Sequence, residues 1–168
     1  MFIDEMGSQL GMSRTHARSS KGERAYGTVI RNRGATLTTI GALSHSGIQA
    51  ALVFNGATDK AIFLTFIKEV LLPTLKPGQI VVMDNLGAHR VKEVQTLIES
   101  VGCTLKFTPP YSPEFNPIEE CWSKIKSILR KISARTKESL TAAINTAFAR
   151  ISPSDIIGWF NHAGYRLG

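Results

Sequence analysis

The chain has 168 residues, of which 43% are hydrophobic and 20% charged, and its formal net charge is +7. These values fit one folded domain with a substantial core, and they exclude a long disordered chain or a fibrous repeat. No apolar stretch approaches the roughly 18 residues that a membrane helix needs, and no signal peptide is evident. We therefore expect a cytoplasmic protein that does not bind membranes, with Cys103 and Cys121 as buried free thiols.

The first half of the chain predicts three strands and one helix. Residues Met1–Asp4 form a short apolar strand, and the Gly-, Ser- and Arg-rich stretch that follows is expected to be an exposed loop. Residues 36–43 and 48–54 alternate like strands and are joined by a four-residue segment of hairpin chemistry. A helix comes next, with Thr58 as its N-cap and its end before Pro73.

The second half alternates strands and helices. Residues 79–83 form a short, continuously apolar run, which is typical of an interior strand. A helix is predicted over 91–101, followed by a strand over 104–107 that ends at Pro109-Pro110. The remainder has helical spacing in three segments: 118–132, 140–151 and the stretch after Pro153.

This order of elements predicts an α/β fold with a mixed five-stranded sheet and helices on both faces. In such sheets, chemistry gathers at the carboxyl ends of the strands. Three acidic residues are candidates there: Asp4, Asp84 and Glu119. Taken alone, Asp84 is more typical of a turn or a helix cap, and the Asp4–Glu5 pair is more typical of a solvated terminus.

Helical spacing separates the two neighbouring glutamates at the start of the 118–132 helix. Glu120 precedes Lys124 by four residues, which is the favourable order for a surface ion pair. Glu119 has no such partner, and its face of the helix continues through Lys126 and Arg130. We therefore favour Glu119 as the functional acid and keep Glu120 as the alternative.

Basic residues gather in two segments of the sequence. Residues 12–35 contain six Lys and Arg with one acid, and residues 122–137 contain six with no acid. Nucleic acid is the leading partner class, although two solvated basic faces explain the charge alone equally well. The candidate DNA contacts are Arg14, Arg18, Lys124, Lys126 and Arg130.

Three carboxylates without cysteine ligands favour a hard cation such as Mg²⁺, with Mn²⁺ as a substitute. Beside a basic surface, this donor set suits phosphodiester cleavage by two metal ions about 4 Å apart. One ion would lower the pKa of an attacking water or hydroxyl, and the other would stabilise the leaving oxygen. The two ions would also offset the repulsion among the three anions.

Two segments resemble the second and third acidic motifs of the DDE transposases of the mariner superfamily, in its bacterial insertion-sequence branch: Met83-Asp84-Asn85-Leu86-Gly87-Ala88-His89 and Pro109-Pro110-Tyr111-Ser112-Pro113-Glu114-Phe115-Asn116-Pro117-Ile118-Glu119. The 34 residues between Asp84 and Glu119 (119 − 84 − 1) match the aspartate, aspartate, 34, glutamate variant. Asp4-Glu5 matches the first motif. The resemblance covers nearly the whole chain, through Gly22, Ile40-Gly41-Ala42-Leu43, Leu72-Pro73, Pro77-Gly78 and Trp122-Ser123-Lys124-Ile125-Lys126.

The resemblance implies a ribonuclease H-like catalytic domain that cuts transposon ends and joins them to target DNA, typically at TA. It implies two Mg²⁺ ions held by Asp4, Asp84 and Glu119, with water as the nucleophile for cleavage and the freed 3′ hydroxyl for strand transfer. The residues that match positions beside the acids, and are expected to support the metal ligands or contact DNA, are Asn85, His89 and Asn116. Trp122 continues an apolar stripe and is expected in the core.

Members of this family normally carry helix-turn-helix domains before the catalytic core, whereas this sequence starts three residues ahead of Asp4. We expect a single catalytic domain over residues 1–168, with DNA recognition supplied by a separately encoded helix-turn-helix protein or lost in a truncated copy. The first strand also looks shortened to almost nothing. A homodimer and a location at the bacterial nucleoid are further expectations.

Two other functions fit some of the same features. One is a non-catalytic DNA-binding remnant of a transposase, which metal-dependent nicking would exclude. The other is a phosphoacceptor signalling domain with one Mg²⁺ ion, built from an acidic pair and a later strand-end aspartate. That second alternative gives Glu119 no role and does not explain the basic segments.

Overall fold

The computed structural model describes residues 1–29, 34–84, 92–110 and 112–166. Its centre is a five-stranded sheet with the order β3-β2-β1-β4-β5. The strands are β1 (Phe2–Gln9), β2 (Thr36–Ser44), β3 (Gly47–Asn55), β4 (Ile80–Met83) and β5 (Thr104–Phe107). β1 pairs antiparallel with β2 and parallel with β4, so the sheet is mixed, as predicted.

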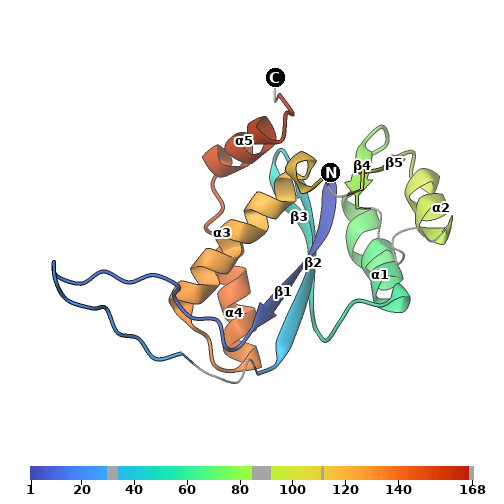
Figure 1. Cartoon of the computed structure of the whole chain (residues 1–168). Coiled ribbons are helices and arrows are strands. Elements are labelled where there is room, and N and C mark those ends of the chain that lie inside the picture. The colour runs from blue at the N-terminus through green and yellow to red at the C-terminus, as the bar shows by residue number, and fades with distance from the viewer. Residues whose placement is uncertain (30–33, 85–91, 111, 167–168) are drawn as a thin grey trace.

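Helices cover both faces of the sheet, also as predicted (Figure 1). On one face lie α1 (Lys60–Thr65), its continuations η1 (Phe66–Leu71) and η2 (Leu72–Thr74), and α2 (Lys92–Ser100). On the other lie α3 (Pro117–Ile132), α4 (Lys137–Phe148) and α5 (Pro153–His162), and α3 follows the short turn η3 (Pro113–Phe115). Each face has its own apolar core, so the sheet is covered on both sides.

The first strand is longer than the sequence indicated, and the prediction of a strand ending at Asp4 is wrong. β1 runs over eight residues and occupies the centre of the sheet. Its second half contains Met6 and Ser8, both fully buried, alternating with the exposed Gly7. The second half of β1 is mostly polar, and for that reason the sequence did not predict it as a strand. It pairs with β2, and the first residues of β1 pair with β4 as well.

The start of α1 also differs from the prediction. Its N-cap is Asp59, whose Oδ1 accepts a hydrogen bond of 2.8 Å from the backbone N–H of Ile62. Thr58 instead donates from Oγ1 to Oε2 of Glu5 at 2.7 Å, and so ties the start of the helix to β1. The helical segment continues through Pro73, because a proline fits the first turn of the 3₁₀ helix η2.

The other predicted elements are present with small shifts in their ends. The hairpin turn is shorter than predicted, because β2 ends at Ser44 and β3 begins at Gly47, where φ is 113°. α4 begins three residues before the predicted start and is capped by Thr136. Cys103 and Cys121 are buried free thiols, as predicted.

Residues 10–35, which we call the arm, leave the sheet after β1 and return to it at β2. Within its described part, residues 14–29 are exposed and form no helix or strand, in agreement with the predicted loop. Figure 1 shows the arm extending away from the body of the protein beside the end of α3. In the residues that the structure describes, no helix is long and apolar enough to cross a membrane.

Candidate active site

Asp4 lies in the middle of the central strand, on the face that α3 covers. It pairs with Gly41 of β2 in the register of the sheet. Side chains alternate between the faces of a strand, and Phe2 and Met6 pack in the core beneath α3. Glu5 therefore faces the other side, where it accepts the hydrogen bond from Thr58. This alternation separates the two members of the acidic pair.

Asp84 follows β4 directly and is partly buried. Ile3 pairs with Met83 across the parallel strands, so the next step of the same register sets Asp4 beside Asp84. Neighbouring strands are about 4.8 Å apart. Val82 packs in the core beneath α3 and Met83 in the opposite core, and continuing this alternation puts Asp84 on the same face as Asp4.

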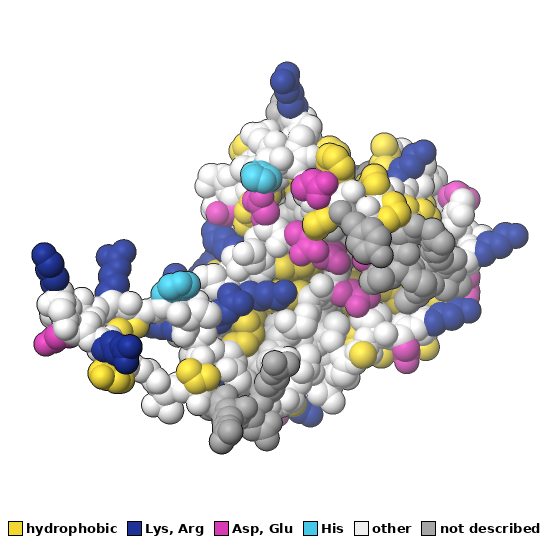
Figure 2. Space-filling view, viewed as in Figure 1, with side chains coloured by type: hydrophobic (Ala, Val, Ile, Leu, Met, Phe, Trp, Pro, Cys, Tyr) yellow, Lys and Arg dark blue, Asp and Glu magenta, His cyan; other side chains and the backbone are white. Residues whose placement is uncertain are grey.

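Glu119 is the third residue of α3, and its side chain is exposed. Burial is the largest cause of the raised pKa of Asp4, and the negative charges of Glu119 and Asp84 raise it further. The structure thus brings the three candidate acids, from β1, the end of β4 and the start of α3, within electrostatic reach of one another. Figure 2 shows acidic side chains gathered near the middle of the face shown.

Glu120 is turned toward a different partner, and the predicted ion pair with Lys124 is absent. Its Oε1 lies 3.6 Å from Nε2 of His162 in α5. Lys124 instead pairs with Asp155, the third residue of α5. Both contacts join α3 to α5. Residues four apart on a helix often form ion pairs, but here α5 packs against this side of α3 and offers Glu120 and Lys124 closer partners.

The environment of Asp4 disfavours its charged form. Burial raises its pKa to about 7, and the charges of Glu119 and Asp84 add to that effect. Hydrogen bonds from the backbone N–H of Glu5 and from the side chain of Trp122 act in the opposite direction. In the protein without a cation, Asp4 is therefore about half protonated near neutral pH, and a nearby positive charge would favour its ionised form.

Trp122 contacts a candidate acid, a role that the sequence did not predict for this core residue. It is buried in the core, and its Nε1 also donates a hydrogen bond of 3.0 Å to Oδ2 of Asp4. Gly41 makes this approach possible, because a Cβ at that position would lie 2.5 Å from Cη2 of Trp122. The signal was available in the sequence, since a buried indole N–H usually finds an acceptor.

Asn116 occupies the N-cap position of α3 without capping it through its side chain. It is 8% exposed, and its Oδ1 has no hydrogen-bond partner in the described part of the chain. Its backbone oxygen accepts the N–H of Glu119 at 3.1 Å. A buried acceptor without a partner, next to a candidate acid, is a position where a bound molecule or ion could satisfy it. The other two residues predicted beside the acids, Asn85 and His89, lie outside the described residues.

The donor chemistry of the three acids fits a hard divalent cation. All three offer carboxylate oxygens, which Mg²⁺ and Mn²⁺ prefer. Burial and, after it, the charges of Glu119 and Asp84 raise the pKa of Asp4, and a bound cation would favour its ionised form. Among the described residues, no three His, Cys, Asp or Glu side chains form a closed metal-binding arrangement. Mutual repulsion is expected to hold carboxylates apart in a chain without cations.

The predicted DNA contacts fall into two groups. Arg14 and Arg18 are exposed on the arm, and Lys126 and Arg130 lie along α3, each partly exposed. Lys124 is held in its ion pair with Asp155. Figure 2 shows basic side chains over the arm and the adjoining body, apart from the acidic group. On the face shown, the acidic group near the centre thus lies beside the basic side chains of the arm, and further basic side chains lie at the other edges.

The chain matches one family model and several solved structures. The model of the family described as DDE superfamily endonuclease matches residues 1–141. This range contains all three candidate acids. A search of curated protein sequences found no match.

Solved structures of the Mos1 transposase share the fold. Its paired-end complex with the left transposon end has a TM-score of 0.80 and 17% identity, covering 96% of this chain and 51% of that one. A mariner Mos1 paired-end complex with Mg gives a TM-score of 0.74 and 17% identity, with 97% and 52% covered. The Mos1 catalytic domain with raltegravir and Mg gives 0.68 and 13%, with 97% and 80% covered.

The chain spans about half the length of the Mos1 chains in the two paired-end complexes. At these identities the likeness concerns the fold, and it confirms the predicted ribonuclease H-like arrangement of sheet and helices.

Proposed function

The chain belongs to the DDE superfamily endonucleases, and from that membership we propose that it is the catalytic domain of a DNA transposase. In this proposal it cuts DNA at transposon ends and transfers the cut strand to target DNA, using divalent metal ions. Asp4, Asp84 and Glu119 are the metal ligands. The observation that carries the proposal is the electrostatic coupling of Asp4, inside β1, to Asp84 directly after β4 and to Glu119 at the start of α3.

Each of the three acids comes from an element with its own support. Asp4 is fixed on β1 by hydrogen bonds from Trp122 and from the backbone N–H of Glu5. Asp84 is set by the parallel pairing of β1 with β4. Glu119 is set by α3, whose apolar side packs on the sheet. Rigid elements of this kind hold ligand oxygens in place more precisely than loops do.

Two bound divalent ions would activate the attacking water or 3′ hydroxyl and stabilise the leaving oxygen of the phosphodiester. The chain's own residues bind the cations and orient the DNA. The three carboxylates hold the charge that attracts the cations, and Trp122 keeps the Asp4 carboxylate turned toward the α3 face. The basic residues of α3 and the arm draw the polyanionic backbone across the site.

The position of Glu119 favours this proposal over a phosphoacceptor signalling domain. The site of such a signalling domain needs the acidic pair and the aspartate at the strand end, and it leaves Glu119 without a role. Here Glu5, the second member of that pair, is on the opposite face and bonded to Thr58. The charge of Glu119 acts on Asp4 instead.

We also propose the subfamily, target site and assembly that the family resemblance implies. The interval of 34 residues between Asp84 and Glu119 supports membership in the aspartate, aspartate, 34, glutamate variant of the bacterial insertion-sequence branch. We propose TA target sites, action as a homodimer at the bacterial nucleoid, and recognition of the ends through a helix-turn-helix module outside this catalytic domain.

A nicking assay tests the proposal. The chain is incubated with labelled duplexes carrying the element's ends, with Mg²⁺, with Mn²⁺ or with EDTA. We expect cleavage only with a divalent ion, and its loss in Asp84→Asn and Glu119→Gln, which keep side-chain size and remove a ligand charge. A folded wild-type chain that never cuts DNA with either ion would favour the non-catalytic remnant.

Glu120→Gln is the matched control, because it removes the same charge from the next residue of the same helix turn. Glu120 contacts His162 rather than the acidic centre. We expect this variant to cut DNA at a rate within a few-fold of the parent. Loss of cleavage in Glu120→Gln together with normal cleavage in Glu119→Gln would overturn the ligand assignment.

A further inference from the structure

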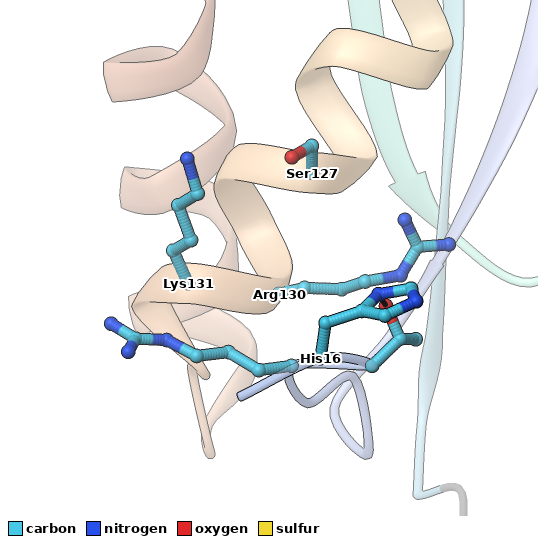
Figure 3. Close-up of a pocket in the computed structure, with 6 residues that line it drawn as sticks. His16, Ser127, Arg130 and Lys131 are labelled. Carbon is cyan, nitrogen blue, oxygen red and sulfur yellow. Dashed lines mark hydrogen bonds between the residues drawn. The ribbon is translucent and has the colours of Figure 1, made fainter. Parts of the chain in front are cut away.

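A second charged site lies at the other end of α3, where the arm crosses the helix. Six residues from two distant parts of the sequence line a pocket of about 360 Å³, which we call the arm pocket: Arg14, Thr15, His16, Ser127, Arg130 and Lys131. Figure 3 shows Arg130 and His16 close together on one side of α3, with Lys131 projecting from the other side of the helix end. The lining is basic and hydroxylic and contains no carboxylate.

Among the residues that the structure describes, no carboxylate pairs with the cations of the arm pocket, Arg14, Arg130 and Lys131. The helix α3 has no acid after Glu120. Other lysines of the protein do have partners: Lys124 pairs with Asp155, and Lys68 with Glu93. Like charges held together repel, so an anion in the arm pocket would be stabilised by every cation that lines it.

Specific contacts hold the arm in this position. Arg135, just beyond α3, donates from Nη1 to the backbone oxygens of Leu10 and Met12, at 2.9 and 3.4 Å. Leu10 also donates its backbone N–H to Ala35, which joins the two ends of the arm, and both Leu10 and Met12 pack against the core beneath α3. The base of the arm is therefore fixed to α3, and Arg14 to His16 follow directly from that fixed base.

The lining chemistry selects a phosphate group. Guanidinium and ammonium groups are strong donors to phosphate oxygens, and the hydroxyl of Ser127 adds a further donor. Oγ1 of Thr15 lies 2.9 Å from Nδ1 of His16 and shares a hydrogen bond with it. No aromatic ring other than the imidazole of His16 lines the pocket, so it offers no platform of Phe, Tyr or Trp on which a base could stack. These features suit a backbone phosphate rather than a base.

Resting on the proposed function, we propose that the arm pocket binds one backbone phosphate of the DNA at a fixed distance from the reacting phosphate. Arg130 follows Glu119 by eleven residues, which is about 16 Å along a helix. That length spans about five steps of 3.4 Å along the axis of a DNA duplex. The arm pocket would thereby set which phosphodiester bond reaches the acidic centre.

A binding experiment without metal ions tests the pocket independently of cleavage. The pocket variant is Arg130→Gln/Lys131→Gln, and the matched control is Lys60→Gln/Lys76→Gln, which removes the same charge from exposed positions on the α1 side of the sheet. Affinity for a short fluorescent duplex is measured over a salt series. We expect the pocket variant to lose at least tenfold in affinity and to have a log–log salt slope shallower by about 1, as for one lost phosphate contact.

The control variant should keep the parent slope and lose only a few-fold in affinity. Equal losses in the two variants would overturn the pocket, because they would show a general effect of net charge. In a second experiment, inorganic phosphate is added at constant ionic strength. A pocket for backbone phosphate should also accept inorganic phosphate, so we expect this competitor to weaken DNA binding by the parent more than by the pocket variant. Equal weakening of both proteins would overturn the pocket.

The position of the bound phosphate is tested by cleavage in Mg²⁺ of duplexes that carry one uncharged methylphosphonate at successive positions. We expect the parent to be slowed by a substitution about five steps from the cut, and the pocket variant to be insensitive to that substitution. The same sensitivity profile in both proteins would overturn the spacing. If the parent cuts no DNA at all, the proposed function fails, while the metal-free binding comparison still decides whether the pocket binds phosphate.

Discussion

Replacing Asp4 by Asn is expected to stabilise the protein in the absence of metal ions, and to do so only where Asp4 would be charged. The carboxyl is 8% exposed and has a pKa of about 7, against 3.8 for the ordinary group. Asn keeps the size of the side chain and an oxygen that can accept the hydrogen bond from Trp122. It removes the charge that burial, Glu119 and Asp84 make unfavourable.

The sign and size of this stabilisation follow from the pKa values of Asp4 in the folded and in the unfolded chain. Because the folded-state pKa is raised, the folded chain holds a proton that the unfolded chain has lost between pH 3.8 and about 7. The free energy of unfolding of the parent therefore falls across this range and stops falling above it. The full difference is about 4 kcal/mol, from 3.2 pKa units at about 1.4 kcal/mol each. For a chain of this length that corresponds to about 10 °C in Tm.

The assay is urea unfolding of the parent and Asp4→Asn in EDTA at several pH values from about 4 to about 8. We expect the two stabilities to be close at the acid end and to diverge by up to about 4 kcal/mol at the alkaline end. Glu69→Gln, at an exposed position of η1, is the control and should differ from the parent by a constant amount.

Mg²⁺ should narrow the difference in stability between the two proteins at the alkaline end. At a tenfold excess over its Kd, a ligand that binds only the folded state adds about 1.4 kcal/mol, and Asp4→Asn has lost one of the proposed ligands. Stability curves of the parent and Asp4→Asn that run parallel over the whole pH range would refute the argument. That result would mean that the carboxyl of Asp4 is not forced to titrate by its surroundings.

Three further predictions concern the contacts around the site. Gly41→Ala should lower the free energy of unfolding by about 1–3 kcal/mol, because its Cβ would lie 2.5 Å from the ring of Trp122; Gly7→Ala, where the nearest atom is 3.9 Å away, should cost far less in the same urea titration. Trp122→Phe should cost about 1–3 kcal/mol, and more at pH 8 than at pH 5, because the lost N–H stabilised the charged form of Asp4. Asp155→Ala should cost about 1–2 kcal/mol at pH 7, and the loss should shrink as the pH approaches the pKa of Asp155, which its lysine partner and Ser152 lower to about 2.

Each of these has an outcome that contradicts it. Equal losses in Gly41→Ala and Gly7→Ala would show that the indole does not need the space above Gly41. A pH-independent loss in Trp122→Phe would assign the residue to packing alone. A loss in Asp155→Ala that persists at pH 2 would mean that the contact with Lys124 contributes through shape rather than charge.

The sequence by itself determined the order of the elements and their faces. Period-two and helical patterns of apolar residues predicted the hairpin of 36–54, the strands at 80–83 and 104–107, and the helix 117–132 within a few residues. These patterns suffice because burial on one face requires them wherever the element is placed. The positions of Asp84 and Glu119 could also be predicted from the sequence. Asp84 directly follows an apolar strand, and Glu119 lies near the start of a helix that begins at a proline.

Only the tertiary structure decided which of two neighbouring residues serves the site and which partner each charge takes. Asp4 and Glu5 are equivalent in the sequence, and the pairing of β1 between β2 and β4 assigns them to opposite faces. Glu120 contacts His162, and not the lysine one turn away, because α5 packs beside α3. The contact of Trp122 with Asp4 joins residues 118 positions apart and depends on the missing side chain of Gly41. Local periodicity fixes the face of an element, whereas contacts between distant segments depend on how those faces meet.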